Sequence, residues 1–296
     1  MKQISPAARR RRAKRKDALR GLCFLAPSLL GVAVFFVAPF VLVLRYSLTD
    51  INGSFVKLQN FAALVKNPVF RMAAKNTLVF SAAAVPLSVA LAIVLALLLE
   101  CRIPMKSTFR SFFLSPIMVP VASVVLIWQV LFSSNGTVNV LVTALGGTAV
   151  DWLNSEYAPL VVLLLFLWKN LGYNMILFMA GLANIPRDLL EVAEVEGASA
   201  AYRFFAIKLR YLSPTVLFTA ILSLISSFKI FREVWLLAGN YPYESIYTLQ
   251  HFMNNMFNAL DYQRLSAAAV LMALVMIAVI ALLFAVEDRF GKDVEG

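Results

Sequence analysis

Charged residues are scarce in this sequence, at 15% of its 296 residues, whereas soluble proteins average about 25%. Hydrophobic residues make up 61%, which exceeds the roughly 45–50% that is usual for soluble proteins. This composition excludes an ordinary soluble globular protein, and it predicts a chain whose function depends on a membrane.

Histidine and cysteine are nearly absent. The chain has one histidine, His251, and two cysteines, Cys23 and Cys101, which are too few for a disulfide framework or a Cys/His metal cluster. We therefore expect no metal site. His251 lies in a polar, aromatic loop, where an exposed position or a structural hydrogen bond is expected.

Nucleotide-binding and catalytic motifs are missing too. No G-x-x-x-x-G-K-[ST] loop occurs, because Gly291-Lys292 is followed by Asp293 and lacks the upstream glycine. We expect that the chain is not an enzyme and binds no cofactor. Energy for its work must then come from an ion gradient or from a partner protein.

The net charge of +11 is concentrated at the N-terminus, where nine of the 27 Lys and Arg lie within the first 20 residues. Such a cluster is a local tail rather than a basic binding face, so we expect no nucleic-acid partner.

Six long apolar runs follow this tail. A bilayer core of about 30 Å takes roughly 20 apolar residues in helix. The sequence predicts an all-α membrane domain over residues 22–290, between a basic tail (1–21) and a short C-terminal tail (291–296). The expected spans are residues 22–44, 77–99, 111–132, 158–181, 213–239 and 265–286.

The orientation follows from the basic residues outside the spans. Eighteen of them fall on the side of the two termini and six on the other side. Because cytoplasmic segments carry the excess of Lys and Arg, both termini are expected in the cytoplasm.

The segment between the fourth and fifth spans, residues 185–212, has the pattern of a helix, a turn and a helix. Pro186 can begin a helix, Gly197 can end it with a positive φ, and Ser199 can cap a second one. The segment has more apolar residues than a bare loop needs. It is either an interfacial amphipathic linker or a docking element for a cytoplasmic partner.

The residues of this segment carry a resemblance. The run from Glu191 to Ala198 (EVAEVEGA), followed by Ile207 and Leu209, resembles the "EAA" signature of the membrane subunits of bacterial ABC importers. That signature reads E-A-A, three residues, G, nine residues, I-x-L-P. This chain departs from it at Val192, in place of Ala, and at Arg210, in place of Pro.

The similarity extends over roughly residues 22–290 and is strongest to sugar-type permeases, as the first permease of a pair. Ala26-Pro27, Trp168-Lys169 with Gly172, and the run from Ala180 to Pro186 carry it. The resemblance implies the type I ABC importer permease fold in a bacterial inner membrane. It also implies three kinds of partner besides membrane lipid: a second permease, two cytoplasmic ATPase subunits that use the ATP, and an extracytoplasmic solute-binding protein.

The resemblance further implies that the signature segment is a coupling helix pair that docks on the ATPase. The residues expected to make this coupling are Glu191, Ala193, Glu196, Gly197, Ala198, Ile207 and Leu209.

A second group of candidates lies within the fourth span. Lys169, Asn170, Tyr173 and Asn174 form a polar stripe, because residues three and four apart share a helix face. The stripe either lines a pathway for a sugar or polyol, or binds the partner permease by interhelical hydrogen bonds.

Three charged residues of the fifth span, Lys229, Arg232 and Glu233, are spaced for mutual pairing. Glycerol phosphate or another small anionic solute is an alternative cargo, for which Lys169, Lys229 and Arg232 would be ligands. A secondary transporter or channel would need an acidic relay, and Glu233 is the only carboxylate within the expected spans.

Overall fold

The computed structural model describes residues 21–22, 24–101 and 104–291. These residues are helical apart from their connections, and their only strand-like pairing is an isolated antiparallel bridge between Thr49 and Phe55. The all-α fold is therefore confirmed. Most of the two expected tails, residues 1–20 and 292–296, lies outside the described residues.

Within the described residues, six helical stretches are long and apolar enough to cross a membrane. They are Phe24–Ser47, Pro68–Glu100, Val121–Ala144, Ala158–Ala183, Ser213–Ala238 and Tyr262–Arg289. The second stretch begins at Pro68 rather than at Thr77, because Asn67 caps it: its side chain accepts hydrogen bonds from the N–H groups of Val69 and Phe70.

The chain divides into two compact units, the first formed by the residues up to Leu64 together with residues 261–271. This unit contains the π-helical η1 (Ala33–Val37), α2 (Ala38–Ser47) and most of α3 (Gln59–Lys66). The Asn60 amide donates hydrogen bonds to the carbonyl oxygens of Ser47 (3.0 Å) and Thr49 (2.9 Å). These bonds hold α3 against the end of α2.

The second unit contains residues 65–260 and the rest of the last helix. Its elements are α4 (Pro68–Glu100), α5 (Lys106–Met118), α6 (Val121–Phe132), α7 (Thr137–Ala144), α8 (Ala158–Ala183), α9 (Arg187–Val195), α10 (Ala200–Tyr202), η2 (Arg203–Lys208), α11 (Leu209–Tyr211), α12 (Ser213–Phe228), α13 (Phe231–Ala238), η3 (Glu244–Ile246), α14 (Leu249–Asn258) and, from Met272 onward, α15 (Tyr262–Gly291).

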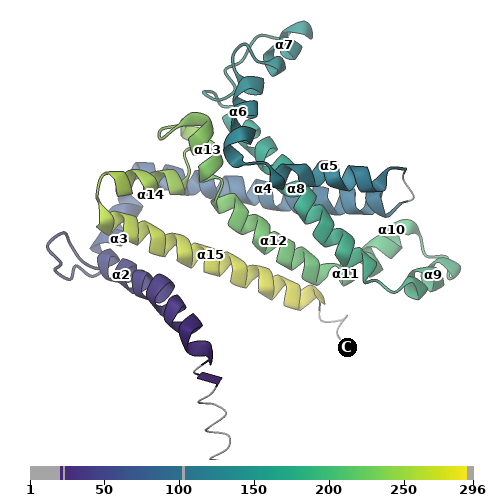
Figure 1. Ribbon diagram of the computed structural model, residues 1–296, viewed down its shortest axis with the longest axis horizontal. Coiled ribbons are helices and arrows are strands. Elements are labelled where there is room, and N and C mark those ends of the chain that lie inside the picture. The colour runs from purple at the N-terminus through teal and green to yellow at the C-terminus, as the bar shows by residue number, and fades with distance from the viewer. Residues whose placement is uncertain (1–20, 23, 102–103, 292–296) are drawn as a thin grey trace, which may run out of the picture. The chain divides into compact units, whose positions relative to one another are not determined.

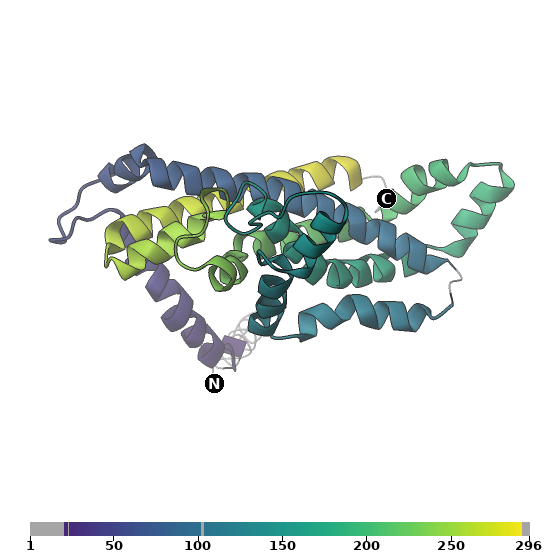
Figure 2. The same ribbon diagram turned by 90° about the horizontal axis from the view of Figure 1, so that it is seen from above.

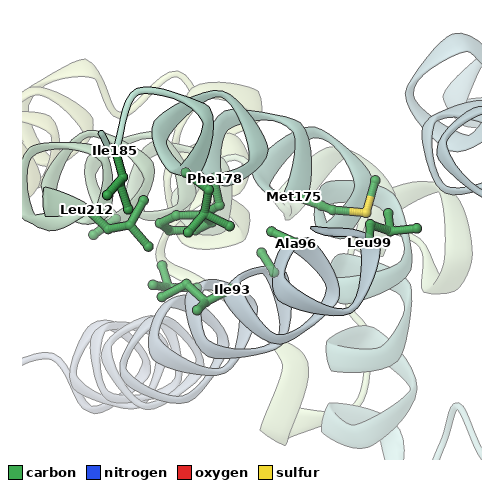
Figure 3. Close-up of a cluster of buried hydrophobic side chains, with 11 residues drawn as sticks. Ile93, Ala96, Leu99, Met175, Phe178, Ile185 and Leu212 are labelled. Carbon is green, nitrogen blue, oxygen red and sulfur yellow. The ribbon is translucent and has the colours of Figure 1, made fainter. Parts of the chain in front are cut away.

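The centre of this unit is formed by α4, α8 and α12, which run alongside one another (Figures 1 and 2). Small residues recur at every third or fourth position along the buried face of α4, namely Thr77, Ser81, Ala84, Ser88, Ala92 and Ala96. Such residues let helix backbones approach closely, which is how helices associate where lipid offers no hydrophobic driving force. Figure 3 shows Ile93, Ala96 and Leu99 packed against Met175 and Phe178 of α8.

Gly172 allows α5 to lie directly on α8. A Cβ atom at this position would be 1.8 Å from the carbonyl oxygen of Phe113, a distance that no side chain tolerates. The backbone contact therefore requires glycine here.

The third apolar run differs from the single helix expected over residues 111–132. It forms α5 and α6, which are separated at Val119 and Pro120. Pro120 lacks an N–H group and disfavours a helical conformation for the residue before it; Val119 is extended, with φ −86° and ψ 133°. The membrane-length stretch that begins at Val121 instead continues through α7.

The fifth span is also broken. Lys229 and Ile230 form a turn between α12 and α13, and α13 ends at Gly239, which has a φ of 79°. Three charged side chains at this break, those of Lys229, Arg232 and Glu233, line one cavity.

Candidate functional site

The segment of residues 185–212 is a helix, a turn and a helical run. Both views show α9 and α10 at one end of the bundle, beyond the end of α4 (Figures 1 and 2). Helix α9 begins directly after Pro186, and the Ser199 hydroxyl caps α10 by accepting a hydrogen bond from the Tyr202 N–H at 3.2 Å. The expected start, turn and cap are confirmed.

Gly197 forms the turn between the two helical parts. Its φ is 82°, and the N–H of Ala198 donates to the carbonyl oxygen of Ala193 at 2.9 Å, which closes the end of α9. A Cβ at Gly197 would meet no atom within 4 Å. Glycine is therefore favoured here by the positive φ alone, and not by close packing.

The segment has an inner and an outer apolar surface. Leu190, Phe204 and Ile207 pack against the core between α4 and α8. Val192, Val195, Tyr202 and Phe205 point away from it, and Val195 is 88% exposed. A short projecting element thus exposes several large apolar side chains, as expected of a protein-binding site.

The residues expected to contact an ATPase occupy three different kinds of position in this segment. Glu191 and Glu196 are exposed, Ala193, Ala198 and Gly197 build the turn, and Ile207 and Leu209 are half-buried toward the bundle. Only the first group presents charged side chains outward. Ile207 positions the segment instead, because it anchors the segment on the core.

Ion pairs between described residues stabilise the segment. Arg203 pairs with Glu194 across the turn. The Lys208 ammonium lies 2.6 Å from a carboxylate oxygen of Glu100, at the end of α4. The segment is thus joined to the long helix α4 as well as to its neighbours α8 and α12.

A polar cavity of about 550 Å³ lies at the break in the fifth span. Lys169 and Asn170 of α8 line one side of it, and Lys229, Arg232 and Glu233 line the other. Ser226, Gln250 and a few apolar side chains complete its wall.

Lys169 and Glu233 form an ion pair in this wall. The Glu233 side chain is only 7% exposed and that of Lys169 is 25% exposed. The prediction that Lys229, Arg232 and Glu233 pair among themselves is therefore wrong for Glu233, because the break after Phe228 turns this carboxylate toward α8. Asn170 donates a hydrogen bond to the Phe166 carbonyl at 2.8 Å.

Tyr173 and Asn174, the other two members of the expected stripe, do not line the cavity. Asn174 is 2% exposed, and its amide donates to the hydroxyls of Ser88 on α4 (2.8 Å) and Ser223 on α12 (2.9 Å). Both bonds lie within the chain and join α8 to α4 and α12, whereas a role of Asn174 in the solute pathway or at the partner permease stays a prediction. Tyr173 is exposed on the surface of the bundle.

The hydroxyl partners of Asn174 were not predicted from the sequence. Ser227 and Ser81 form a second hydroxyl contact between α12 and α4, at 2.8 Å. The sequence signal for this interface is the recurrence of serine on the two spans at intervals that match one helix face.

His251 is fully buried at the start of α14. Its Nδ1 accepts a hydrogen bond from the Thr248 N–H at 3.3 Å and lies 2.8 Å from the Thr248 hydroxyl. Burial lowers the pKa of His251 to about 4. The expected structural hydrogen bond of this residue is confirmed.

Comparison with known proteins also identifies the chain as a membrane transport component. Residues 88–296 match the protein family described as binding-protein-dependent transport system inner membrane component. The lactose transport system permease protein LacF of Rhizobium radiobacter is 29% identical over 93% of this chain and 97% of its own length. The sn-glycerol-3-phosphate transport system permease protein UgpA of Yersinia enterocolitica is 28% identical over 89% of this chain and 92% of its own length.

The fold matches a solved structure as well. A crystal structure of a bacterial ABC transporter for import of the acidic polysaccharide alginate contains a chain that superposes with a TM-score of 0.82 at 20% identity. The match covers 95% of this chain and 99% of the other.

Proposed function

Because the chain belongs to the family of binding-protein-dependent transport system inner membrane components, we propose that it is the membrane-spanning permease subunit of an ABC importer that takes up a sugar or related polyol. The family description and the six apolar helices make it a multi-pass inner-membrane protein. The observation that carries the proposal is the 185–212 segment, whose outward apolar patch and exposed Glu191 and Glu196 lie on an element that projects from the bundle.

In this proposal the outer surface of the segment docks on an ATPase subunit in the cytoplasm. Contacts of Leu190, Phe204 and Ile207 with the core, and of Lys208 with Glu100, make the segment rigid relative to α4 and α8. Closure of the ATPases would then move these helices, and the polar cavity would change its access between the two sides.

In this proposal the chain works with two cytoplasmic ATPase subunits, a second permease and an extracytoplasmic solute-binding protein. ATP is used by the ATPase subunits, and the chain itself acts without a cofactor or a catalytic site. Both termini lie in the cytoplasm, since 18 of the basic residues outside the spans share their side. Single cysteines at Ser134 and Asn255 should then react with an impermeant thiol reagent on intact cells, and one at Ser199 should not.

Two glycines allow a matched test of coupling. Gly197 and Gly146 both have a positive φ, of 82° and 87°, and a Cβ at either would meet no atom within 4 Å. Valine at either position causes the same kind of backbone strain, of about 1–3 kcal/mol. Gly146, however, lies in the connection after α7, away from the projecting segment.

We expect that Gly197→Val abolishes uptake, or uncouples it from ATP hydrolysis, in proteoliposomes that contain the complete complex. Lactose and sn-glycerol 3-phosphate serve as the test solutes, each with its loaded binding protein. Gly146→Val should retain uptake. Normal uptake in Gly197→Val, or uptake driven by an ion gradient without ATP, would contradict the proposal.

An anionic solute is the second candidate, and the charges of the cavity favour it. Lys169, Lys229 and Arg232 line the cavity with a single carboxylate, Glu233. The charge of Glu233 is compensated by Lys169. Lys229 and Arg232 therefore give the lining of the cavity a net positive charge. In the variant Lys229→Gln/Arg232→Gln, loss of glycerol 3-phosphate uptake with lactose uptake retained would identify an anionic cargo, and the reverse pattern a neutral one.

A further inference from the structure

A second cavity, of about 440 Å³, lies between the start of α12 and the end of α15. Figure 1 shows the C-terminal part of α15, in yellow, beside α11 and α12. Both helices reach this cavity with their ends, so it opens at the same end of the bundle as the 185–212 segment. We call it the α12–α15 groove.

The inner part of the groove is apolar. Val216, Leu217 and Ala220 line it from α12, and Leu283 and Val286 line it from α15. At a rise of about 1.5 Å per residue, the lining from Ser213 to Ala220 extends about 10 Å along the helix. This length suits the first part of an acyl chain that lies parallel to the two helices.

The mouth of the groove is polar and carries more positive than negative side chains. Arg210 and Arg289 line it, together with Glu287 and the Ser213 hydroxyl. Both arginines are exposed, one from each wall. Guanidinium groups bind phosphate oxygens through paired hydrogen bonds, which lysine cannot form. Arg210 is also the residue that stands where the EAA signature has proline, so the signature itself does not account for it.

The surroundings of α15 indicate what fills the groove. No residue in the most apolar 18-residue stretch of α15 is buried within the described part of the chain. This helix therefore meets the bilayer over much of its length. A site with an apolar interior, basic residues at its mouth and access from lipid matches one occupant, an anionic phospholipid.

We propose that the α12–α15 groove binds an anionic phospholipid of the leaflet next to the 185–212 segment. Arg210 and Arg289 hold the phosphate, the Ser213 hydroxyl donates a hydrogen bond to it, and an acyl chain lies along Val216, Leu217 and Leu283. Arg210 follows Leu209 directly, at the point where the segment joins α12. A bound phosphate there stabilises this junction, so anionic lipid supports coupling without contacting the transported solute.

The test uses the purified transport complex in nanodiscs of phosphatidylcholine mixed with phosphatidylglycerol, two lipids that differ in charge. Native mass spectrometry counts the lipids retained. The wild-type complex should retain phosphatidylglycerol over phosphatidylcholine, and Arg210→Gln/Arg289→Gln should lower this retention about tenfold. The matched control is Lys66→Gln/Arg71→Gln, which removes two exposed basic groups, one at the end of α3 and one at the start of α4, and should leave retention unchanged.

Two further arms distinguish the possible occupants. Leu217→Trp, which fills the groove but keeps both arginines, should also reduce phosphatidylglycerol retention. Inorganic phosphate at millimolar concentration should not displace the lipid; if it does, the site recognises free phosphate and the acyl-chain part of the proposal fails. Equal retention of the two lipids, or retention unchanged in the arginine variant, overturns the proposal. The proposal is also overturned if phosphatidylglycerol is retained only when the second permease is absent, because the groove is then an interface with that protein.

Discussion

Lys169 of α8 and Glu233 of α13 form an ion pair in the wall of the polar cavity, although 64 residues separate them in the chain. Helix α12 stops at Phe228 and α13 starts at Phe231, so Glu233 lies in the first turn after the break in the fifth span. A charge at membrane depth is costly unless it faces protein or water, and here each charge is compensated by the other. The remaining basic side chains, Lys229 and Arg232, keep their charge available to the cavity.

Glu233→Gln should destabilise the protein markedly, because it leaves the ammonium of Lys169 without its carboxylate. Removing one partner of a buried pair costs about 3–5 kcal/mol, and the partial exposure of Lys169 places the expected loss near the lower end. Thermal unfolding of the purified protein in detergent measures this loss.

The double variant Lys169→Met/Glu233→Gln provides the control. It removes both charges, so most of the lost stability should return, and the coupling energy of the pair follows from the cycle of four proteins. Additive effects of the two substitutions would mean that the two groups do not interact in the membrane.

Asn174→Leu should lower stability by about 1–3 kcal/mol, because it removes two interhelical hydrogen bonds and leaves the hydroxyls of Ser88 and Ser223 without their partner. Thermal unfolding should reveal the loss, and Ser88→Ala should give a smaller loss of the same kind. Tyr173→Leu is the comparison on the same helix; its side chain is exposed, so little stability should be lost. Unchanged stability in Asn174→Leu with loss of uptake would instead assign Asn174 to the solute pathway.

The positions of the four polar residues on α8, from Lys169 to Asn174, indicate how far the sequence could predict the site. Their spacing predicts a shared helix face, and it does so from local geometry alone. Which part of that face meets the cavity depends on α4 and α12, whose Ser88 and Ser223 are 86 and 49 residues away from Asn174. Lys169 and Asn170 line the cavity and Asn174 does not, a difference that the sequence alone could not predict; a contact of any of them with the solute stays a prediction.

The helix, turn and helical run of the 185–212 segment were predictable from the sequence, because the residues that determine them act locally. Pro186, Gly197 and Ser199 determine a start, a turn and a cap through their own backbone and side-chain chemistry. The breaks in the third and fifth apolar runs were harder. Pro120 was a usable signal for the first break. The turn at Lys229 and Ile230 contains neither proline nor glycine, and it depends on packing against distant residues.

His251 makes stability depend on pH. Its pKa is lowered from 6.5 to about 4 by burial, so below pH 6.5 the unfolded chain binds a proton that the folded chain does not. The contribution of His251 to the free energy of unfolding should therefore be constant above this range and fall as the pH drops from about 6.5 to about 4. Between pH 7.5 and pH 5 the expected loss is about 2 kcal/mol.

The comparison of wild type with His251→Gln isolates this effect, since the chain has no other histidine. The substitution can lower the melting temperature at every pH, but the difference in melting temperature between pH 7.5 and pH 5 should become smaller. An equal pH dependence in the two proteins would mean that His251 is not the titrating group.

The final prediction concerns the charge that the coupling segment presents outward. Glu191 and Glu194 lie on the same short helix, and Glu194 pairs with Arg203 within the chain. Glu191 is exposed, and no ion pair or side-chain hydrogen bond involves it among the residues that the structure describes. Its carboxylate is therefore free to pair with a basic group of the ATPase, where it would be partly desolvated and worth more than a surface ion pair.

Glu191→Lys should weaken binding of the ATPase subunit to the membrane complex by about tenfold or more, because it replaces an attraction with a repulsion between like charges. The folded permease should keep its stability, since the side chain forms no ion pair or hydrogen bond with the residues that the structure describes. Co-purification of the ATPase at increasing salt measures the loss. Glu156→Lys makes the same charge change at an exposed position before α8, at the other end of that helix from the coupling segment, and should leave binding unchanged. If both variants lose the ATPase alike, net charge rather than docking at Glu191 is responsible; if neither does, the docking contact is carried by the apolar patch of Val192, Val195 and Tyr202.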